Sequence, residues 1–581
     1  MRPQILTVMA FPITLTHNEE AFDRMKVLLA AINAKYIHSN PAVYSLKAYV
    51  AEYGEDVEIV EYTINHREEA ILADLYEKNP DVIAFSCYIW NWHFVQPLLR
   101  ELPKVLPQTD LWLGGPEVSY HCEKVATAFP QIKGIIVGEG EVTFAEILAR
   151  YKKAEETGGD APFDDIPGIY LPGSGLTGER ELTDLSEIPF FYHDMGAFEN
   201  RIVYYESSRG CPFRCSYCLS SIDKSMRLRP LDTVRRELAF FLEKRVPQIK
   251  FIDRTFNCNH EHAKAIWQYI KDNDNGVTNF HFEIAADLID EEELSILRGM
   301  RPGLVQLEIG VQSTNEQTIR EINRVMDYGK LRHVVETIES AHNIHVHLDL
   351  IAGLPYEDLT SFKKSFDDVY AMHPNQLQLG FLKVLKGAPM YERASEYGLS
   401  YTDDPPYEVL QTRWLSYADV LELKRVEEMV ELYYNSNQFV HTVQYLETLF
   451  DRPYELYAAL AKEYEDKGYF VQTPARSYRY EILLKFACGI DPKSEEVVRE
   501  LLTFDMYLRE KCKSRPSFAA DLAPYKEELK ARETDKKDHI EVFYHPVWSE
   551  DPEKRTKDPY YVRFSYGKGD PLTQNAEVTV E

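Results

Sequence analysis

Two long stretches of this chain alternate short apolar segments with amphipathic ones, over residues 25–150 and again over residues 201–384. In the first stretch, the segments 25–30, 57–62, 82–86, 111–113 and 134–137 have the length and residue types of buried strands. Apolar strands that alternate with helices form parallel sheets covered by helices on both faces. The first stretch therefore predicts a doubly wound, flavodoxin-like (Rossmann-like) α/β sheet.

The second stretch repeats the same pattern six times, with strands expected at 202–205, 249–252, 279–285, 304–310, 346–351 and 376–384. Six such repeats predict a partial (β/α)6 barrel of the TIM type, whose chemistry lies at the carboxyl ends of its strands. A chain of 581 residues is too long for one core. We expect an extension at 1–24, the sheet at 25–150, a linker rich in turn residues at 151–194, the barrel at 195–395 and a C-terminal extension at 396–581.

The C-terminal extension is rich in tyrosine and charge, and it shows helical periodicity at 417–434 and 454–467. The segments 539–544 and 560–565 alternate like paired strands, and 525–537 reads as a solvated helix face or a linker. We expect a mainly helical region with a few strands, which closes the substrate cavity.

Composition limits the classes of partner. The net charge is -29 and no basic tract is present, which argues against nucleic acid as the main partner. Eight cysteines in so long a chain do not form a disulfide scaffold and fit a reducing cytoplasm. No stretch approaches the ~20 apolar residues of a membrane span. The segment 5–15 lacks the features of a signal peptide, and Met25 is an alternative natural start.

Three cysteines, Cys211, Cys215 and Cys218, follow the first expected barrel strand with the spacing C-x3-C-x2-C. Thiolates are soft ligands that suit iron–sulfur clusters or zinc. Closed structural sites take four protein ligands, so three thiols suit a four-iron cluster with one iron open to another molecule. The alternatives are three merely buried thiols, or a zinc knuckle whose fourth ligand is His260 or His262.

This loop resembles the signature of the radical S-adenosylmethionine (SAM) superfamily, in which an aromatic residue, here Tyr217, precedes the third cysteine. The resemblance implies that Cys211, Cys215 and Cys218 hold a [4Fe-4S] cluster whose open iron binds SAM, and that SAM is cleaved to a 5'-deoxyadenosyl radical. It continues along the strand ends of residues 195–395. The positions that it assigns to SAM binding are Tyr217, Asp253, Glu283, Glu308, Gln312, Ser313, Arg324 and Gly353. It assigns no catalytic residue.

The segments 79–88, 113–119 and 137–141 together resemble the cobalamin-binding domain that precedes many radical SAM domains. The D-x-H-x-x-G loop of many cobalamin modules is absent, so we expect His38 to be a loop histidine and the lower face of cobalt to lack an imidazole. No G-x-G-x-x-G follows the first strand, which disfavours a dinucleotide. The cobalamin-binding residues implied are Ser86, Tyr88, Trp90, Asn91, Gly114, Gly115, Pro116, Glu117, Gly138 and Gly140.

The two resemblances imply a cytoplasmic radical SAM enzyme that uses cobalamin to transfer a methyl group to an unactivated carbon. We expect a small-molecule substrate and an electron donor of the flavodoxin or ferredoxin type. The first alternative keeps both cofactors but catalyses a rearrangement or a redox reaction. A methylthiotransferase is disfavoured because it needs a second three-cysteine site, where residues 25–150 offer only Cys87 and Cys122. A non-catalytic cobalamin sensor is the fourth possibility.

Overall fold

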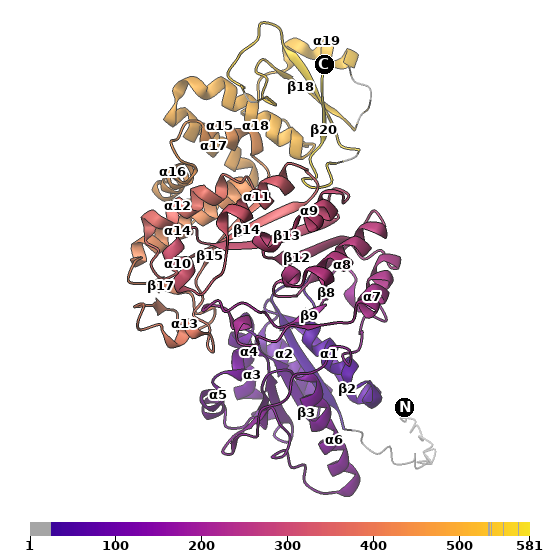
Figure 1. Cartoon of the computed structure of the whole chain (residues 1–581). Helices are drawn as coiled ribbons and strands as arrows, with labels where there is room; N and C mark the ends of the chain where they lie inside the picture. The colour runs from indigo at the N-terminus through magenta and orange to yellow at the C-terminus, as the bar shows by residue number, and fades with distance from the viewer. Residues whose placement is uncertain (1–24, 533–534, 536, 550, 568) are drawn as a thin grey trace, which may run out of the picture. The chain divides into compact units, whose positions relative to one another are not determined.

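The computed structural model describes residues 25–532, 535, 537–549, 551–567 and 569–581. The predicted N-terminal extension, 1–24, lies outside these residues. The chain divides into two compact units (Figure 1). The first contains the described residues up to Lys35 and those from Asn40 to Leu182, and the second contains Tyr36–Ser39 and Thr183–Glu581.

The first unit is built on a parallel sheet, as predicted. Its strands are β1 (Val27–Asn33), β2 (Val57–Thr63), β3 (Val82–Ser86), β4 (Asp110–Gly114) and β5 (Gly134–Ile136), in the order β2-β1-β3-β4-β5. All seven residues of β1, which lies between β2 and β3, are buried. This is the flavodoxin-like strand order, in which ligands bind beyond the carboxyl ends of β1 and β3.

Helices connect these strands and supply two apolar cores. The principal helices are α1 (Pro41–Tyr49), α2 (Glu68–Lys78), α3 (Trp92–Val105) and α6 (Glu141–Thr157), and the short ones are α4 (Pro116–Ser119) and α5 (Cys122–Ala128). A 3-10 turn at Ala51–Asp56 precedes β2.

A short hairpin extends the same sheet beyond β5. It consists of β6 (Ile169–Leu171), which is antiparallel to β5, and β7 (Gly175–Leu176), which is antiparallel to β6. This hairpin lies within residues 151–194, where a linker was expected, and its strands pair with the sheet. Sequence patterns missed this hairpin because each of its strands is only two or three residues long.

The second unit begins with a parallel six-stranded sheet, again as predicted. The strands β8 (Val203–Tyr205), β11 (Gln248–Phe251), β12 (Asn279–Ile284), β13 (Val305–Gln312), β14 (His345–Ala352) and β15 (Gln376–Phe381) are neighbours in chain order. The alternating helices are α7 (Leu231–Glu243), α8 (His260–Asp272), α9 (Glu291–Arg298), α11 (Tyr328–Glu339) and α12 (Leu359–Tyr370), with the short α10 (Glu316–Glu321) after β13 (Figure 1).

The two faces of this barrel sheet differ in chemistry. Phe282 of β12 is fully buried and contacts Trp267 of α8, with ring centroids 6.0 Å apart, so this face packs against the helices. Side chains alternate along a strand. The opposite, inner face therefore carries polar residues such as Lys250, Glu283 and Glu308. An inner face of this kind suits polar ligands.

Both outer strands of the barrel have covered edges. At β8, Ile202 N–H donates to the carbonyl of Ile37 (2.8 Å), within a parallel bridge that pairs His38 with Ile202. At β15, the Asn435 side chain accepts from Leu377 N–H (2.9 Å) and donates to Leu377 C=O (2.8 Å). Covering an edge satisfies backbone groups that would otherwise pair with another chain.

The C-terminal region is mainly helical, as expected. It comprises α14 (Tyr417–Met429), a π-helix (Val430–Asn435), α15 (Val440–Glu447), α16 (Pro453–Asp466), α17 (Arg476–Ile490), α18 (Glu495–Arg509) and α19 (Lys526–Arg532). The predicted strand pair is confirmed as β18 (His539–Phe543) and β19 (Tyr560–Ser565), and β20 (Glu577–Val580), which was not predicted, completes the sheet.

Several small elements link the barrel to this region. They are β9 (Ser208–Arg209), β10 (Arg227–Leu228), α13 (Pro389–Glu392), β16 (Ser400–Tyr401) and β17 (Val409–Gln411). Among the described residues, no helix has the length and apolar character needed to cross a membrane.

Candidate active site

The three-cysteine loop follows β8, the first barrel strand. It begins at Gly210, whose φ is 91° and where an added Cβ would lie 1.6 Å from the carbonyl oxygen of Ser225. Only glycine fits there. Backbone hydrogen bonds hold the loop: Cys211 N–H donates to Asp223 C=O (3.1 Å) and Ser216 N–H donates to Ile322 C=O (2.8 Å). The loop is therefore fixed at the carboxyl end of the barrel.

The thiols on this loop are free to bind a metal cluster. None of the eight cysteines forms a disulfide, and Cys211 and Cys215 are buried while Cys218 is partly exposed. Burial raises the pKa of the Cys215 thiol, and the nearby Arg324 opposes the shift. Three unpaired thiols from one rigid loop fit a [4Fe-4S] cluster with one open iron.

Cys258 is a neighbour of this loop that sequence patterns did not identify. It lies in a 3-10 turn (Phe256–Cys258) after β11, and burial raises its pKa to about 12, with a further contribution from the Cys211 thiol. The sequence could have identified Cys258, because it comes shortly after the second barrel strand. The carboxyl ends of parallel strands meet at one edge of the sheet.

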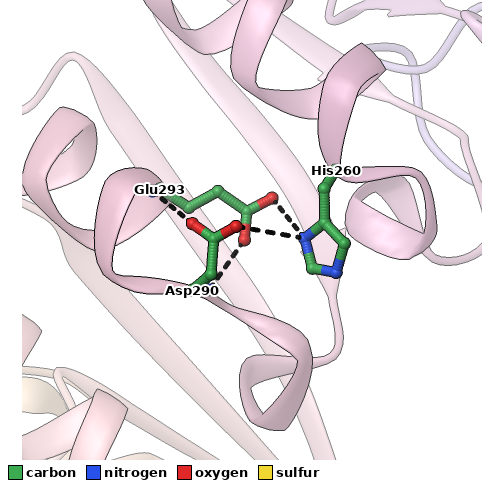
Figure 2. Close-up of side chains that lie close together, drawn as sticks. All are labelled: His260, Asp290 and Glu293. Atoms are coloured by element: carbon green, nitrogen blue, oxygen red, sulfur yellow. Dashed lines mark hydrogen bonds and ion pairs between the residues drawn. The ribbon is translucent and has the colours of Figure 1, made fainter.

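The zinc-knuckle alternative required an imidazole beside the loop. His260 instead belongs to a separate cluster with Asp290 and Glu293 (Figure 2). Its Nδ1 lies 3.0 Å from Glu293 Oε1, while Asp290 N–H donates to Glu293 Oε2 (2.9 Å) and Glu293 N–H donates to Asp290 Oδ1 (2.9 Å). These last two bonds form the capping box of α9. His260 therefore connects the start of α8 to the start of α9.

His262, the other candidate, is 4% exposed, and burial lowers its pKa to about 4. Neither imidazole has a hydrogen bond to a thiol within the described parts of the chain. The side chains around the loop therefore favour the cluster over zinc.

Arg324 connects the loop to the fourth barrel strand. Its Nη1 lies 3.9 Å from Cys215 Sγ and donates to the Tyr217 hydroxyl (3.4 Å), and its Nη2 donates to the Gly310 carbonyl. Two residues predicted to contact SAM, Arg324 and Tyr217, thus lie together against a predicted cluster ligand. Desolvation on burial raises the pKa of the Tyr217 hydroxyl.

The end of β13 is irregular where the resemblance places the SAM ribose. Gln312 has a φ of 72°, and the register with β14 shifts between Gly310 and Gln312. The Gln312 Oε1 atom is buried without a hydrogen-bond partner. Such local strain is typical of functional sites. Gln312 therefore keeps an unused acceptor for a ligand.

The side chain of Ser313, unlike that of Gln312, has its hydrogen-bonding partners within the protein. It is fully buried, and its hydroxyl donates to Glu357 Oε1 (2.6 Å), which also accepts from Ser365 (2.9 Å). Burial raises the pKa of Glu357 to about 7. The structure thus gives the Ser313 side chain a supporting role, and Glu357 is a buried partner that sequence reasoning did not identify.

Two further predicted SAM positions also shape the site from within. Asp253 is 1% exposed and accepts from Ser207 N–H (3.0 Å), Ser207 Oγ (2.6 Å) and Ser208 Oγ (2.5 Å), just before the cysteine loop. Gly353 has a φ of 92°, and an added Cβ would lie 2.7 Å from Val409 Cγ1. The Asp253 carboxylate therefore positions the loop, and Gly353 allows β17 to approach.

Glu283 and Glu308 lie on the inner face of the barrel. Glu308 Oε2 lies 3.0 Å from both Lys250 Nζ and His281 Nε2, and Lys250 lies 3.7 Å from Glu283. Burial opposes ionisation, but His281 and Lys250 outweigh it and hold the pKa of Glu308 at about 2. Burial, together with the Glu308 charge, raises the pKa of Glu283. Glu283 and Glu308, both predicted to bind SAM, therefore share the ammonium group of Lys250.

The end of β3 and the loop after it carry four of the predicted cobalamin residues, Ser86, Tyr88, Trp90 and Asn91. Tyr88 and Trp90 stack, with centroids 4.3 Å apart and an interplanar angle of 11°, and Trp90 is 44% exposed. Asn91 is fully buried and donates to the carbonyls of Ile32 (3.1 Å) and Ser86 (2.8 Å). Asn91 thus ties the ends of β1 and β3 together, beside the aromatic pair.

The loops after β4 and β5 lie at the same end of this sheet. Gly115 has a φ of 105°, and an added Cβ would lie 2.5 Å from the Cys87 carbonyl oxygen. Gly114, Gly115, Pro116 and Glu117 lead into α4, Gly138 has a φ of 82° with open space around it, and Gly140 precedes α6. Backbone exposed at glycines suits a large ligand at close approach.

His38 was expected to be a loop histidine. It lies in the second unit, where its Nδ1 is 2.6 Å from the Tyr204 hydroxyl. Cys87 is buried and donates to Phe85 C=O (3.5 Å), and Cys122 donates to Val118 C=O (3.3 Å). Within the described part of the first unit these are the only two cysteines, so it offers no second three-thiol site.

Comparison with known protein families identifies three regions. The B12 binding domain family matches residues 27–148, and the radical SAM superfamily matches residues 205–369. A family described as a protein of unknown function, DUF4080, matches residues 395–566. The fold, the cysteine loop and the second match define a member of the radical SAM superfamily. With the first match, the chain is a cobalamin-binding radical SAM protein with a C-terminal DUF4080 region.

Individual curated proteins resemble this chain at low sequence identity. A cobalamin-dependent radical SAM methyltransferase, TokK of Streptomyces tokunonensis, is 24% identical over 55% of the chain and 50% of its own length. An anaerobic magnesium-protoporphyrin IX monomethyl ester cyclase of Synechocystis is 24% identical over 69% of the chain and 82% of its own length. The chain thus spans about half the length of the first of these relatives.

Among solved structures, the cobalamin-dependent SAM radical enzyme OxsB aligns with a TM-score of 0.56 and 16% identity, over 86% of this chain and 77% of its own. At this identity the likeness concerns the fold alone. It agrees with the predicted α/β architecture. The cofactors expected from the matched domains are the [4Fe-4S] cluster and SAM for residues 205–369 and cobalamin for residues 27–148.

Proposed function

We propose that this protein is a radical SAM enzyme that uses cobalamin to methylate an unactivated carbon of a small molecule. The observation that carries the proposal is the free three-thiol loop at the end of β8, in the same chain as a B12 binding domain. The similarity to TokK, which is named a cobalamin-dependent radical SAM methyltransferase, supports methyl transfer as the reaction.

The residues present fit these groups. Cys211, Cys215 and Cys218 would hold the cluster, and the stacked Tyr88 and Trp90 would contact the corrin. Bound there, the cluster with SAM supplies radical chemistry at a carbon, and cobalamin supplies a carrier for the methyl group.

The protein's own contribution is positioning. Arg324 donates hydrogen bonds to Tyr217 and to the Gly310 carbonyl and places its charge beside Cys215, which favours the ionised thiol there. Asp253 anchors the chain that enters the cysteine loop. Rigid support of this kind holds reacting groups within a narrow range of geometry.

A second candidate is a redox or cyclisation reaction that uses the same cofactors without methyl transfer. The similarity to the protoporphyrin ester cyclase favours it, because that match covers more of both chains than the match to TokK. A methylthiotransferase is disfavoured by the first unit, where Cys87 and Cys122 both donate to backbone carbonyls.

The substrate we propose is a small molecule rather than a nucleic acid, which the net charge of -29 disfavours. The cluster also needs a reductant, and we propose a protein of the flavodoxin or ferredoxin type. The DUF4080 region closes the barrel edge at β15, which supports our expectation that it bounds the substrate cavity.

One experiment separates the two candidates. The anaerobic holoprotein, with cluster and cobalamin, is incubated with a reductant, an extract of small metabolites and SAM that carries an isotopically labelled methyl group. Methyl transfer predicts label in a new small molecule, together with 5'-deoxyadenosine. Formation of 5'-deoxyadenosine with a converted but unlabelled metabolite would support the redox or cyclisation reaction. The Cys215→Ala variant is the control and should form neither product.

A further inference from the structure

Within the described residues, three groups of histidine and carboxylate side chains have their potential ligand atoms close together. The first is His260, Asp290 and Glu293 (Figure 2). Its fully buried carboxylate, Glu293, accepts from a backbone N–H at Oε2 and contacts His260 at Oε1. The helix cap therefore accounts for this group, and it has no vacant ligand atoms at its centre.

The second group, Glu496, Glu500 and His545, lies in the C-terminal region. Glu500 Oε2 accepts from the backbone N–H of Tyr544 (2.9 Å) and of His545 (2.8 Å), and Glu496 forms an ion pair with Arg555 (2.8 Å). Protein donors again occupy the carboxylates. This group acts as a structural link between α18 and the segment after β18.

The third group lies on the inner face of the barrel, on two neighbouring strands. Glu308 of β13 is the register partner of His347 of β14, and Asp349 lies two residues further along the same face of β14. Their potential ligand atoms all lie within 4.8 Å of one another. His281 of β12 adjoins them, with Nε2 3.0 Å from Glu308 Oε2.

Among the described residues, this third group and the adjoining His281 have three buried polar atoms without a hydrogen-bond partner, whereas the second group has one, His545 Nδ1. His281 is 7% exposed and His347 is 6% exposed, yet the Nε2 atoms of both are buried without a hydrogen-bond partner. Asp349 Oδ1 also lacks a hydrogen-bond partner, although it lies 3.1 Å from His347 Nε2. Each unsatisfied buried polar atom costs about 1–3 kcal/mol. Three in one cluster point to a missing ligand.

We propose that Glu308, His347 and Asp349 bind a divalent transition-metal ion, with His281 as a fourth ligand. Imidazole and carboxylate together suit Zn²⁺, Mn²⁺ and Fe²⁺. The two carboxylates balance the charge of such an ion. It would also satisfy the three unpartnered atoms, because a neutral imidazole nitrogen and a carboxylate oxygen both donate lone pairs to a metal.

Lys250 fits this site as a supporting residue. Its Nζ donates to Glu308 Oε2 (3.0 Å), which leaves Glu308 Oε1 for the metal. Carboxylates that bind metals are often held in place by such a hydrogen bond from outside the coordination sphere. A lysine beside one oxygen therefore orients the ligand.

The proposed ligands lie neither on the cysteine loop nor in the first unit, and the proposal reassigns Glu308, a position that the resemblance gives to SAM, to the metal. Glu308 lies within β13, four residues before the last residue, Gln312, whereas the cysteines follow the end of β8. The inference goes beyond the proposed function, because it requires neither SAM cleavage nor methyl transfer. It adds a mononuclear metal to the inner wall of the barrel.

The test uses the full-length holoprotein with its cluster assembled, so that the cysteine thiols are occupied. After dialysis against a chelator, the protein is titrated with Mn²⁺ alone, and free Mn²⁺ is followed by electron paramagnetic resonance. Zinc content after incubation with Zn²⁺ and desalting is measured by mass spectrometry. We expect about one ion per chain that resists desalting.

Two substitutions that keep the side chain close to its original size test the proposed ligands. His347→Gln and Asp349→Asn should each weaken ion binding at least tenfold, whereas His260→Gln, in the capped cluster of Figure 2, should bind like the wild type. Circular dichroism confirms that each variant is folded. Wild-type protein that binds no ion, or a His347→Gln variant that binds as tightly as the wild type, would overturn the proposal. Neither result depends on enzymatic activity, so the proposed function is tested separately.

Discussion

At the scale of single residues, the surroundings of the cysteine loop set its electrostatics. Arg324 lies 3.9 Å from Cys215 Sγ and contacts Tyr217 at the same time. A positive charge beside a cluster favours the reduced, more negative state, because hydrogen bonds and charge near the sulfurs tune the potential. Arg324 therefore has a measurable electronic role in addition to its geometric one.

We predict that Arg324→Gln shifts the reduction potential of the bound cluster to more negative values, on the order of tens of millivolts. Arg324→Lys keeps the charge and should restore part of the shift. The measurement is a potentiometric titration followed by electron paramagnetic resonance. Arg320 is exposed on the nearby α10, so Arg320→Gln is the matched control. A potential equal to that of the wild type in Arg324→Gln would contradict the assignment.

Glu357 gives a prediction about pH. Burial raises its pKa from 4.5 to about 7, so the folded state holds a proton that the unfolded state releases above pH 4.5. The contribution of Glu357 to the free energy of unfolding is therefore fully present below pH 4.5. It is lost as the pH rises through the folded-state pKa. Above pH 7 the buried charge costs on the order of 1–3 kcal/mol.

The Glu357→Gln variant removes this ionisation. Relative to wild type, its free energy of unfolding should rise between pH 5.5 and pH 8, as measured by urea denaturation at both values. Glu396, which is exposed, provides Glu396→Gln as a control with a smaller pH effect of this kind. A difference between variant and wild type that stays constant with pH would exclude Glu357 as the titrating group.

At the scale of elements, the loops at strand ends depend on a few glycines. Gly115 has a φ of 105°, and its hydrogen faces the Cys87 carbonyl oxygen, where an added Cβ would lie at 2.5 Å. Gly115→Ala must therefore displace the loop after β4 or the loop after β3. We predict that the variant loses cobalamin binding at least tenfold, as measured by the corrin absorbance retained after gel filtration.

The matched control for this change is Gly54→Ala. Gly54 also has a positive φ, 52°, but open space surrounds it and it lies outside these loops. Its variant should retain cobalamin like the wild type. Equal cobalamin content in Gly115→Ala and Gly54→Ala would mean that the β4 loop is not part of the binding site.

The edge of the barrel at β15 gives a second prediction at this scale. Asn435, at the end of the π-helix, makes two hydrogen bonds with the backbone of Leu377. Asn435→Ala leaves both backbone groups unpaired and should lower the free energy of unfolding by about 1–3 kcal/mol. Asn273→Ala removes one hydrogen bond at an exposed helix end and should cost less than about 1 kcal/mol. Equal losses in thermal denaturation would argue against an edge-capping role.

The sequence predicted elements best where strands are long and buried. The five parallel strands of the first sheet and the six strands of the barrel were all identified, because short apolar runs between amphipathic helices rarely form anything but buried strands. The short hairpin of β6 and β7 was not predicted, and neither was β20. The π-helix after α14 was expected as ordinary helix, because the two share nearly the same periodicity.

Site residues were harder to assign than strands. Cys211, Cys215 and Cys218 share a spacing that carries a chemical meaning, so the sequence predicted them as cluster ligands. Asp253, Ser313 and Asn91 were predicted to bind cofactors, but the hydrogen bonds of their side chains in the structure are with the protein, which no sequence pattern shows. The cluster of Glu308, His347 and Asp349 was missed because only strand register brings these residues together.

At the scale of the whole molecule, the chain combines a flavodoxin-like unit with a barrel that continues into a helical region. The C-terminal region is part of the second unit and is joined to the barrel by paired tyrosines: Tyr370 of α12 and Tyr457 of α16 have their hydroxyls 2.8 Å apart. Arg452 adds an ion pair with Asp367 of α12. The DUF4080 region is therefore integral to the barrel, which fits a role in bounding the substrate site.

We infer that this one chain holds both a four-iron cluster and cobalamin. The most direct measurement is anaerobic purification with cobalamin supplied, followed by quantification of iron, zinc and corrin per chain. We expect about four irons in the cluster and about one corrin per chain. Tetrahedral zinc on the cysteines in place of the four irons, with no bound corrin, would contradict it.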